Sequence, residues 1–325
     1  MSIADRAPPT LQDRAGATTA NAASHTPSGS AEADLRPRRS PWPAAQLGIQ
    51  SVVPILAGGG TRLPAHVGVL RGLAELGVSF TDLVGVSGGA IVAALHAAGR
   101  SHDDLRDLAL EVDFSQFLGS SLWRLVREGG LSSGNRFERW MDDQIGGVTF
   151  ADLPLDLHVV ATDVRSGAPV IFDRHLTPAL RVARAVRFSM GIPLLFTSQD
   201  YGGHLLVDGS ILAEDALRRD WCGDGTPAVC FRLRSSGQRR RYTSRRWFPL
   251  VHHLSLLLRT FLNTLSREYV TDAHWYRTVV VETGDLSPVE FKMTREEKQR
   301  LYDAGYHATL DHLPWKLDRA LHPPR

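Results

Sequence analysis

Cysteine is scarce in this sequence, and its scarcity excludes several classes of protein. The 325 residues include two cysteines, Cys222 and Cys230. Two cysteines cannot form the disulfide framework of a small secreted domain, and no C-x-x-C pair is present to hold zinc or to act as a dithiol. We therefore expect no metal site and no bound cofactor. The low cysteine content suits a reducing compartment, which favours a cytoplasmic location.

Long apolar runs are absent as well. The most apolar stretch, residues 247–258, is too short to span the hydrocarbon core of a bilayer and contains two histidines. Residues 1–40 contain early acidic residues and lack the apolar core of a signal peptide. We expect neither a signal peptide nor a transmembrane helix.

A large net charge is the third feature that the sequence lacks. The formal net charge is +2, and no nucleic-acid-binding module is recognisable, so we expect no nucleic-acid partner. Apolar residues make up 43% of the chain, which is enough for a sizeable core.

Composition divides the chain into a tail and a globular part. Residues 1–46 are rich in Ala, Ser, Thr, Pro and Arg and have almost no large apolar side chains, which predicts a disordered N-terminal tail. We expect one domain over 47–315, followed by a C-terminal tail over 316–325. Within the domain, the recognisable motifs lie in 50–216, and a C-terminal part over 217–315 contains a basic and apolar segment at 232–262.

The start of the globular part has the pattern of a parallel sheet. A β-branched apolar run at 49–57 predicts a strand, and "LPAHVGVLRGLAELG" at 63–77 predicts a helix with Pro64 in its first turn. A second strand at 80–86 and a second, very apolar helix at 87–99 follow. Strand, helix, strand and helix in this order are typical of an α/β fold with a parallel sheet.

The rest of the domain continues this alternation. We expect helical structure over 101–146 with N-caps at Ser101 and Asn135, and a helix over 177–189 capped by Thr177. The remaining expected elements are strands at 155–164, 168–173, 204–210, 227–234 and 277–283, and a closing helix at 294–313.

Ser87 lies at the junction of the second strand and the second helix. The segment "GVSGGA" at 85–90 fits G-x-S-x-G, the pattern of a nucleophile elbow. Glycines beside the serine permit a strained turn, and the N-terminus of the following helix favours negative charge at the serine oxygen. Isolated matches also occur in ordinary turns, but the strand–turn–helix context favours an activated nucleophile.

Two further segments supply what a serine nucleophile requires. The triplet Gly58, Gly59 and Gly60 follows the first strand, and adjacent parallel strands would place it beside Ser87 at the carboxyl edge of the sheet. Its spacing fits neither a P-loop nor G-x-G-x-x-G, so a nucleotide-binding loop is disfavoured. Asp208 follows a strand in "LLVDGS" and is a candidate base, although an Asp-Gly pair is more often a simple turn.

With these three segments in order, the sequence resembles the patatin-like phospholipase family over roughly residues 50–315. "GGGTRLPAHVGVLRGLAELG" is similar to that family's oxyanion segment, "GVSGGAIVAAL" to its nucleophile segment, and "FSMGIPLLFTSQDYGGHLLVDGS" to the run that leads into its Asp-Gly motif. The resemblance implies a three-layer α/β/α fold with a central, mostly parallel sheet and no cofactor.

The resemblance also implies a mechanism. Ser87 would attack an acyl ester of a lipid or phospholipid, Asp208 would act as general base without a histidine, and the product would leave through an acyl-enzyme. The N–H groups of Gly58, Gly59 and Gly60 would form the oxyanion hole. The residues that flank these motifs are Thr61, Arg62, Gly85, Gly88, Gly89 and Gly209.

The sequence departs from the family pattern at three places. Leu63 and Pro64 follow Arg62 where the family has glycine, and this change borders the oxyanion loop. Ser210 follows Asp-Gly where Gly or Ala is usual. The Asn-x-Pro that often comes next is replaced by "AEDAL".

Two rival functions stay open at this point. An α/β-hydrolase esterase with a Ser-His-Asp triad would require a late histidine at the sheet edge. A non-catalytic lipid-binding or regulatory relative would keep the fold without an activated Ser87.

Residues 239–262 bear on access to a lipid surface. They combine several arginines with Trp247, Phe248 and a leucine-rich run, a pattern that suits peripheral contact with an anionic membrane. A solvated basic loop followed by a core helix fits the same residues.

Overall fold

The structure is a computed structural model, and it describes residues 51–119, 122–209, 219–236 and 277–321. The expected tail at 1–46 and the basic and apolar segment at 239–262 lie outside the described residues. So do the departures at Ser210 and "AEDAL".

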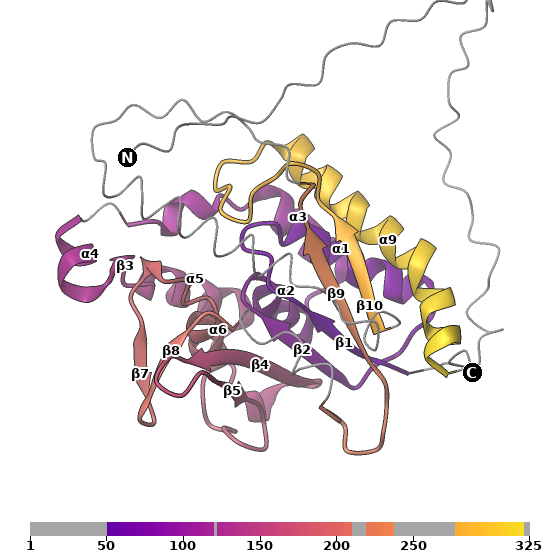
Figure 1. The fold of residues 1–325 in the computed structure, drawn as a ribbon, viewed down its shortest axis with the longest axis horizontal. Helices are drawn as coiled ribbons and strands as arrows, with labels where there is room; N and C mark the ends of the chain where they lie inside the picture. Colours follow the sequence, from indigo (N-terminus) through magenta and orange to yellow (C-terminus); the bar gives the residue numbers. More distant parts are fainter. Residues whose placement is uncertain (1–50, 120–121, 210–218, 237–276, 322–325) are drawn as a thin grey trace, which may run out of the picture. The chain divides into compact units, whose positions relative to one another are not determined.

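A mostly parallel sheet forms the centre of the described part (Figure 1). Its strand order is β10-β9-β1-β2-β4-β8-β7, and β5 pairs with β4 outside this path. Strands β10, β9, β1, β2 and β4 are parallel, whereas β5, β8 and β7 join by antiparallel pairs. A separate small sheet pairs β3 with β6. The strands are β1 (Val53–Leu56), β2 (Asp82–Val86), β3 (Gly130–Ser132), β4 (Asp156–Asp163), β5 (Ala168–Phe172), β6 (Leu194–Phe196), β7 (Gln199–Tyr201), β8 (His204–Val207), β9 (Ala228–Arg234) and β10 (Thr278–Glu282).

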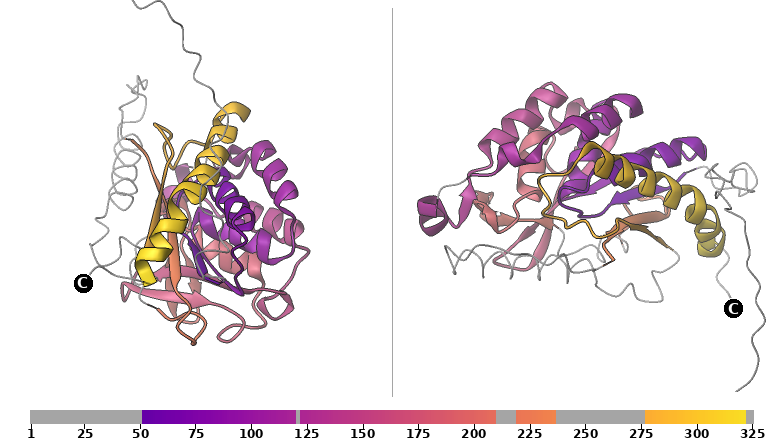
Figure 2. Two further views of the ribbon diagram at one scale, coloured as in Figure 1. Left: turned by 90° about the vertical axis from the view of Figure 1, so that its right-hand side faces the viewer. Right: turned by 90° about the horizontal axis from the view of Figure 1, so that it is seen from above.

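The described helices lie on one face of this sheet, as the view from above in Figure 2 shows. Helices α1 and α2 lie against the central strands, and the long α9 packs beside α1 and β10. The described helices are α1 (Pro64–Glu75), α2 (Gly88–Ala97), α3 (His102–Glu111), α4 (Leu122–Glu128), α5 (Asn135–Ile145), α6 (Val182–Ser189) and α9 (Arg295–Leu321), with 3-10 turns η2 (Phe114–Phe117) and η3 (Phe150–Asp152).

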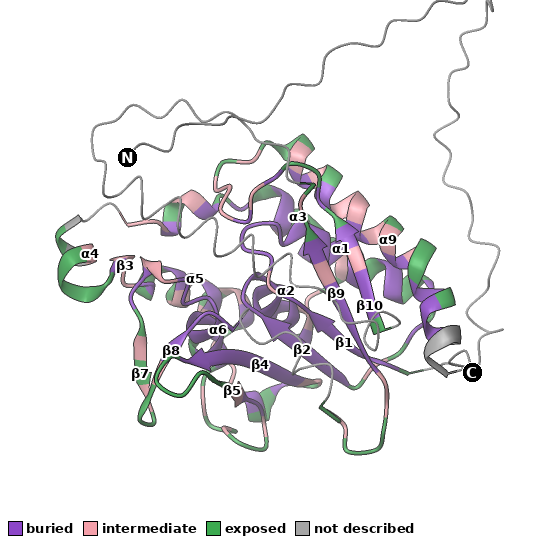
Figure 3. Ribbon diagram, viewed as in Figure 1, coloured by how far each residue is buried: buried purple, intermediate pink, exposed green. Residues whose placement is uncertain are grey.

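The central strands are buried on both faces, which explains their nearly continuous apolar sequence (Figure 3). In β1, Leu56 joins the large apolar cluster beneath the helices, and Val53 and Ile55 join a second cluster on the opposite face. Alternation along an extended strand produces this division.

The β1–β2 pair determines where the functional segments lie. The strands are parallel neighbours, with Leu56 opposite Gly85, so both end at the same edge of the sheet. The glycine triplet follows β1 and Ser87 follows β2. The prediction that these two segments lie side by side is confirmed.

Helices α1 and α9 approach closely because glycine lines their interface. A Cβ atom on Gly68 would collide with the backbone oxygen of Tyr302, and one on Gly305 would collide with the backbone oxygen of Ala65. Close packing of the final helix against the helix that follows the glycine triplet braces the region around the candidate site.

Several boundaries differ from those expected. The helix expected from Thr177 begins at Val182, because residues 178–181 form a turn and a bridge to Thr149. Asn135 is the first residue of α5 rather than its cap, a position taken by Gly134 with a positive φ of 75°. Strand β3 interrupts the helical span expected over 101–146. Helix α9 continues to Leu321, past the boundary expected at 315.

Candidate active site

Ser87 occupies a strained turn between β2 and α2. Its backbone angles are φ 52° and ψ −127°, a region that glycine favours and other residues rarely adopt. Strand β2 ends at Val86 and α2 begins at Gly88, so the side chain of Ser87 projects from the carboxyl edge of the sheet at the N-terminus of a helix. The helix dipole at this position stabilises negative charge.

The glycines around Ser87 are required by close backbone approach. A Cβ atom on Gly85 would lie 2.6 Å from Cα of Ala90, and a Cβ on Gly89 would collide with the backbone oxygen of Leu56. On Gly88 it would collide with the backbone oxygen of Gly60. Side chains at these positions would force the nucleophile turn and the glycine triplet apart.

Asp208 lies directly against Ser87. The Ser87 hydroxyl donates a hydrogen bond to Oδ2 of Asp208 at 2.5 Å, a length typical of a hydrogen bond to a charged acceptor. Both side chains are almost completely buried. The backbone N–H of Asp208 donates to the oxygen of Gly191 at 3.1 Å, and a Cβ on Gly209 would collide with the oxygen of Val160. The backbone on both sides of the carboxylate is therefore fixed.

Two side chains hold the glycine triplet by binding the carbonyl groups of Ala57, which precedes it, and of Gly59. Nε2 of His66 lies 2.7 Å from the Ala57 oxygen and acts as the donor, and Nε of Arg62 donates to the Gly59 oxygen at 3.1 Å. The C=O and N–H of a trans peptide point in opposite directions. The N–H groups of Gly58 and Gly60 are therefore directed away from His66 and Arg62.

These N–H groups are available to a ligand. Within the described residues, the N–H groups of Gly58, Gly59 and Gly60 have no hydrogen-bond acceptor. Gly60 has a positive φ of 59°, and a Cβ there would collide with the oxygen of Pro288. Thr61 fixes the end of the triplet by donating its hydroxyl hydrogen bond to Glu290 O at 2.8 Å.

Buried charge adds to the electrostatics of this loop. Burial lowers the pKa of Arg62 to about 10, so this fully buried guanidinium stays cationic at neutral pH. Nη1 of Arg62 donates to Thr283 Oγ1 at 2.9 Å. Burial also lowers the pKa of His66 to about 4, which keeps its imidazole neutral.

Two residues of the site were not identified from the sequence. The Ser189 hydroxyl accepts a hydrogen bond from the Ser87 N–H at 2.8 Å and donates one to the Val160 oxygen at 2.6 Å. The sulfur of Met190 lies 3.8 Å from the Ser87 hydroxyl. Both lie in "FSMGIP" at 188–193, which begins at the end of the expected helix and starts the run that leads into the Asp-Gly motif.

An apolar cavity lies beside the Ser87–Asp208 pair. Gly60 and Met190, which flank Ser87, line one part of it. The other lining residues are Thr61, Leu63, Phe114, Phe117, Phe137, Ile192, Phe196, Pro288 and Phe291. The lining is suited to a hydrocarbon chain rather than to a polar ligand.

Leu63 lies in the wall of this cavity. It has ordinary right-handed helical angles, φ −57° and ψ −23°, at the N-terminus of α1, so its position does not require glycine. Its side chain is buried among apolar residues. The backbone at this position therefore accommodates leucine in place of glycine, and the leucine side chain forms part of the cavity wall.

Within the described residues, three histidines have polar partners other than Ser87. His158 contacts Asp82 and Asp173, His204 contacts Asp163, and His66 contacts Ala57. None of them hydrogen-bonds Ser87. The described part of the chain therefore gives no support to a Ser-His-Asp triad.

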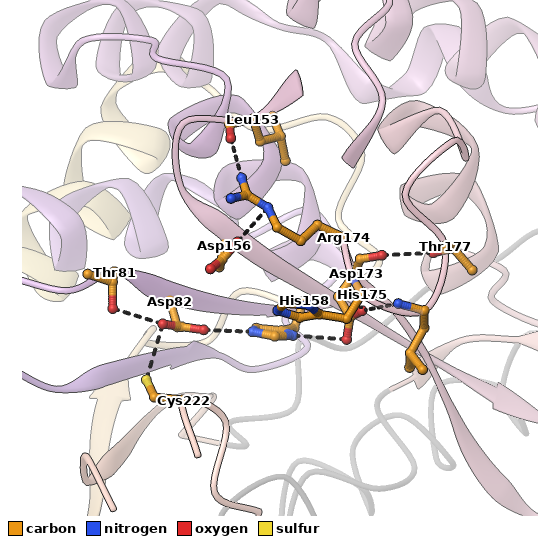
Figure 4. A network of polar contacts seen from close by, with 11 residues as sticks. Thr81, Asp82, Leu153, Asp156, His158, Asp173, Arg174, His175, Thr177 and Cys222 are labelled. Carbon is orange, nitrogen blue, oxygen red and sulfur yellow. Dashed lines mark hydrogen bonds and ion pairs between the residues drawn. The ribbon is translucent and has the colours of Figure 1, made fainter. Parts of the chain in front are cut away.

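A second buried polar cluster lies at the other end of β2 (Figure 4). Asp82, the first residue of β2, accepts a hydrogen bond from Nε2 of His158 at 3.0 Å. Nδ1 of His158 lies 3.3 Å from Oδ2 of Asp173. Cys222 donates to Asp82 at 3.1 Å. This cluster is separated from Ser87 by the length of β2, so we regard it as structural.

In the part of the chain that is described, no cluster of His, Cys, Asp or Glu has the composition of a metal site. No described helix combines the length and hydropathy needed to cross a bilayer.

Comparisons with known proteins agree with the geometry. The model of the patatin-like phospholipase family matches residues 55–217, which include the glycine triplet, Ser87 and Asp208. The chain belongs to the patatin-like phospholipase family, whose members are, at the level of the family, lipid hydrolases. The mostly parallel sheet flanked by helices is the α/β/α fold of this family.

Individual relatives support this assignment. The uncharacterized protein YqhO of Bacillus subtilis is 26% identical over 284 residues, which cover 78% of this chain and 95% of that protein. The uncharacterized NTE family protein Rv1063c of Mycobacterium tuberculosis is 33% identical over 182 residues, covering 56% of this chain and 47% of its own length. The match thus spans about half of the mycobacterial relative. The crystal structure of VipD from Legionella pneumophila has a TM-score of 0.55 at 17% identity, covering 81% of this chain and 67% of that one, which is a similarity of fold.

Proposed function

We propose that this chain is a lipid acyl-ester hydrolase of the phospholipase A or lysophospholipase type that uses Ser87 and Asp208 as a catalytic dyad. The observation that carries the proposal is the 2.5 Å hydrogen bond from the Ser87 hydroxyl to Asp208 in a buried, strained turn beside an apolar cavity. Strained backbone persists where the surroundings impose it, and such positions cluster at active sites.

The reaction begins at the serine oxygen. Asp208 accepts the proton of the Ser87 hydroxyl as the oxygen attacks the ester carbonyl carbon, and the carbonyl π electrons move to the oxygen. The tetrahedral oxyanion accepts hydrogen bonds from the N–H groups of Gly58, Gly59 and Gly60. The dipole of α2 and the charge of Arg62 favour this negative charge.

The intermediate then collapses to an acyl-enzyme. The C–O bond to the alcohol breaks, and the leaving alkoxide takes the proton held by Asp208. A water molecule next gives a proton to Asp208 and attacks the acyl carbon. The bond between the acyl carbon and the Ser87 oxygen then breaks, and Asp208 returns the proton to that oxygen, which releases the fatty acid and restores the dyad. No histidine, metal or redox cofactor takes part in these steps.

Supporting residues orient the dyad and the oxyanion loop. Ser189 fixes the Ser87 N–H, and His66 and Arg62 fix the peptide groups of the glycine triplet. Thr61, Gly85, Gly88, Gly89 and Gly209 allow or secure the close backbone contacts. The acyl chain of the substrate occupies the apolar cavity.

Release of fatty acid from phospholipid and lysophospholipid in mixed micelles tests the proposal. We expect release by the wild-type chain and loss of release in Ser87→Ala. A matched series replaces each histidine that follows Asp208 in the chain, one at a time, and a dyad requires that none is essential. A folded wild-type chain that binds the micelles without releasing fatty acid would favour a non-catalytic lipid-binding protein.

A further inference from the structure

The cavity beside Ser87 has a neighbour from which it is separated by two side chains. A second apolar cavity lies in the helical layer. Its lining residues come from α1, α2, α3 and α5, and include Val67, Ile91, Leu105 and Trp140. Leu63 and Phe114 line both cavities.

This shared lining makes Leu63 and Phe114 a partition. Each of the two residues borders both the cavity that Gly60 and Met190 line and the second cavity. Leu63 is 4% exposed and Phe114 is 6% exposed. Phe114 is also held by edge-on contact with Trp140, whose ring centre lies 6.0 Å away.

Of the two residues of the partition, Leu63 is the one whose side chain the backbone conformation does not require. Its backbone is in the ordinary helical region, where alanine or glycine fits equally well. The motif that the surrounding residues follow has glycine at this position. With a smaller residue, the two apolar spaces would form one longer channel leading from Ser87 into the helical layer.

We propose that Leu63, together with Phe114, limits the length of the acyl chain that this enzyme accepts, so that it prefers lipid esters with shorter acyl chains over those with longer ones. This inference rests on the proposed function, because it assigns a specificity to the same site. An acyl chain attached to Ser87 extends along the first cavity until it meets Leu63 and Phe114. Further methylene groups have no space, and hydrophobic pockets discriminate by roughly tenfold or more per misplaced methylene.

A chain-length profile tests the partition. The substrates are p-nitrophenyl butanoate, octanoate and dodecanoate, and the measured quantity is the ratio of kcat/KM for dodecanoate to that for butanoate. We expect a low ratio in the wild-type chain and an increase of about tenfold or more in Leu63→Ala. Phe114→Leu, a milder change in the other half of the partition, should raise the ratio in the same direction.

Two control variants separate the partition from general loosening of the core. Leu70→Ala truncates an equally buried leucine of α1 that lines neither cavity, and should leave the ratio unchanged. Leu63→Met keeps the volume of the partition and should also keep the wild-type ratio. An unchanged ratio in both folded Leu63→Ala and Phe114→Leu, or an equal rise in Leu70→Ala, would overturn the proposal.

A binding measurement distinguishes failure of this proposal from failure of the proposed function. If the wild-type chain hydrolyses none of the esters, the hydrolase assignment fails. The shift of Tm caused by hexanoate and by dodecanoate then tests the partition without catalysis. A dodecanoate shift that appears in Leu63→Ala but not in the wild type or Leu70→Ala supports the partition, and identical shifts in all three contradict it.

Discussion

The backbone of Ser87 is held in a strained conformation. A φ of 52° with ψ −127° costs a residue with a side chain on the order of 1–3 kcal/mol, and glycine avoids most of this cost. We therefore expect Ser87→Gly to be more stable than Ser87→Ala by about 1 kcal/mol, although both lack the nucleophile. Urea unfolding of the two variants measures the difference. Equal stabilities would mean that this turn is not strained.

His66 is expected to act through the backbone that it binds. Replacement by alanine removes the donor to the Ala57 oxygen and frees the Ala57–Gly58 peptide to rotate. Because small misplacements of catalytic groups can cost about 100-fold, we expect kcat to fall by up to this factor with little change in KM.

The controls for His66 use a conservative and a matched variant. His66→Gln keeps an N–H donor and should recover much of the lost kcat. Leu70→Ala, a core truncation on the same helix, should leave kcat and the rate of fluorophosphonate labelling near wild type. If His66→Ala and Leu70→Ala lower the labelling rate equally, His66 has only a structural role.

The sequence supports prediction of Ser87, Asp208 and the glycine triplet because each leaves a local pattern. Gly85 and Gly89 beside Ser87 indicate a tight turn, and the glycine triplet comes directly after a predicted strand. Ser189 leaves no such pattern. Its contact with the Ser87 N–H joins residues 102 positions apart, and depends on where α6 lies against β4. His66 leaves no such pattern either, because its partner is a backbone oxygen, which any residue could supply.

At the scale of elements, glycines allow α1 and α9 to pack in close contact. An alanine at Gly68 would place a methyl group against the backbone oxygen of Tyr302, so the helices would have to separate. We expect Gly68→Ala to lower the free energy of unfolding by about 1–3 kcal/mol, since overpacking outweighs the gain in helix propensity.

Urea unfolding beside Arg71→Ala checks this expectation. Arg71 is exposed on the same helix, and its 3.8 Å ion pair with Asp103 lies in solvent, so its loss should change stability by about 0.5 kcal/mol or less. Stabilisation by Gly68→Ala, as expected for an isolated helix, would contradict the packing argument.

The elements that were predicted well have strong periodicity or clear ends. Strands β1 and β2 and helices α1 and α2 combine apolar patterning with glycine turns, and Ser101 caps α3 as expected, accepting from the Asp104 N–H. Strands β3 and β6 have three residues each and pair only with one another, so no periodicity marks them. Thr177 and Pro178 form a good helix start locally, but residues 178–181 pair with the segment around Thr149 instead.

At the scale of the whole molecule, the cluster around His158 joins the start of β2, strand β4 and the residues after β5 (Figure 4). Burial alone would lower the pKa of His158, but hydrogen bonds to Asp173 and Asp82 and their charges raise it on balance. Burial alone would raise the pKa values of Asp82 and Asp173, and the hydrogen bonds from His158 and their neighbours lower both. A protonated imidazole between two carboxylates is therefore the favoured state.

The pH dependence of stability follows from these directions. The His158 contribution is complete below the unfolded pKa of about 6.5 and is lost as pH rises through the higher folded value. The Asp82 and Asp173 contributions are complete above about pH 4 and are lost as pH falls through their lower folded values. We expect the stabilising effect of the cluster to be greatest between about pH 4 and 6.5.

Comparison of the wild-type chain with His158→Gln by urea unfolding across pH measures this effect. Glutamine can bond to a carboxylate but does not titrate. The stability difference between the two chains should shrink as pH rises above about 6.5. A difference that stays constant from about pH 5 to 9 would show that His158 is neutral in the folded chain.

The order of the strands in the sheet was the part of the fold that the sequence predicted least well. Parallel pairing of β1 with β2 follows from the βαβ pattern, but β9 pairs with the other edge of β1 after more than 170 intervening residues. No local sequence pattern indicates that β9 pairs with β1. The same long-range packing places Pro288 and Glu290 against Thr61 at the end of the glycine triplet, and therefore contributes to a candidate site whose motifs end at Gly209.

Labelling with a fluorophosphonate probe tests the central claim most directly, because the probe reacts with an activated serine and requires no knowledge of the natural lipid. We expect the wild-type chain to be labelled, Ser87→Ala to be unlabelled, and Asp208→Asn to react about 10²–10⁴ times more slowly. Labelling that persists in Ser87→Ala, or a folded wild-type chain that remains unlabelled with and without liposomes, would contradict the Ser87–Asp208 dyad.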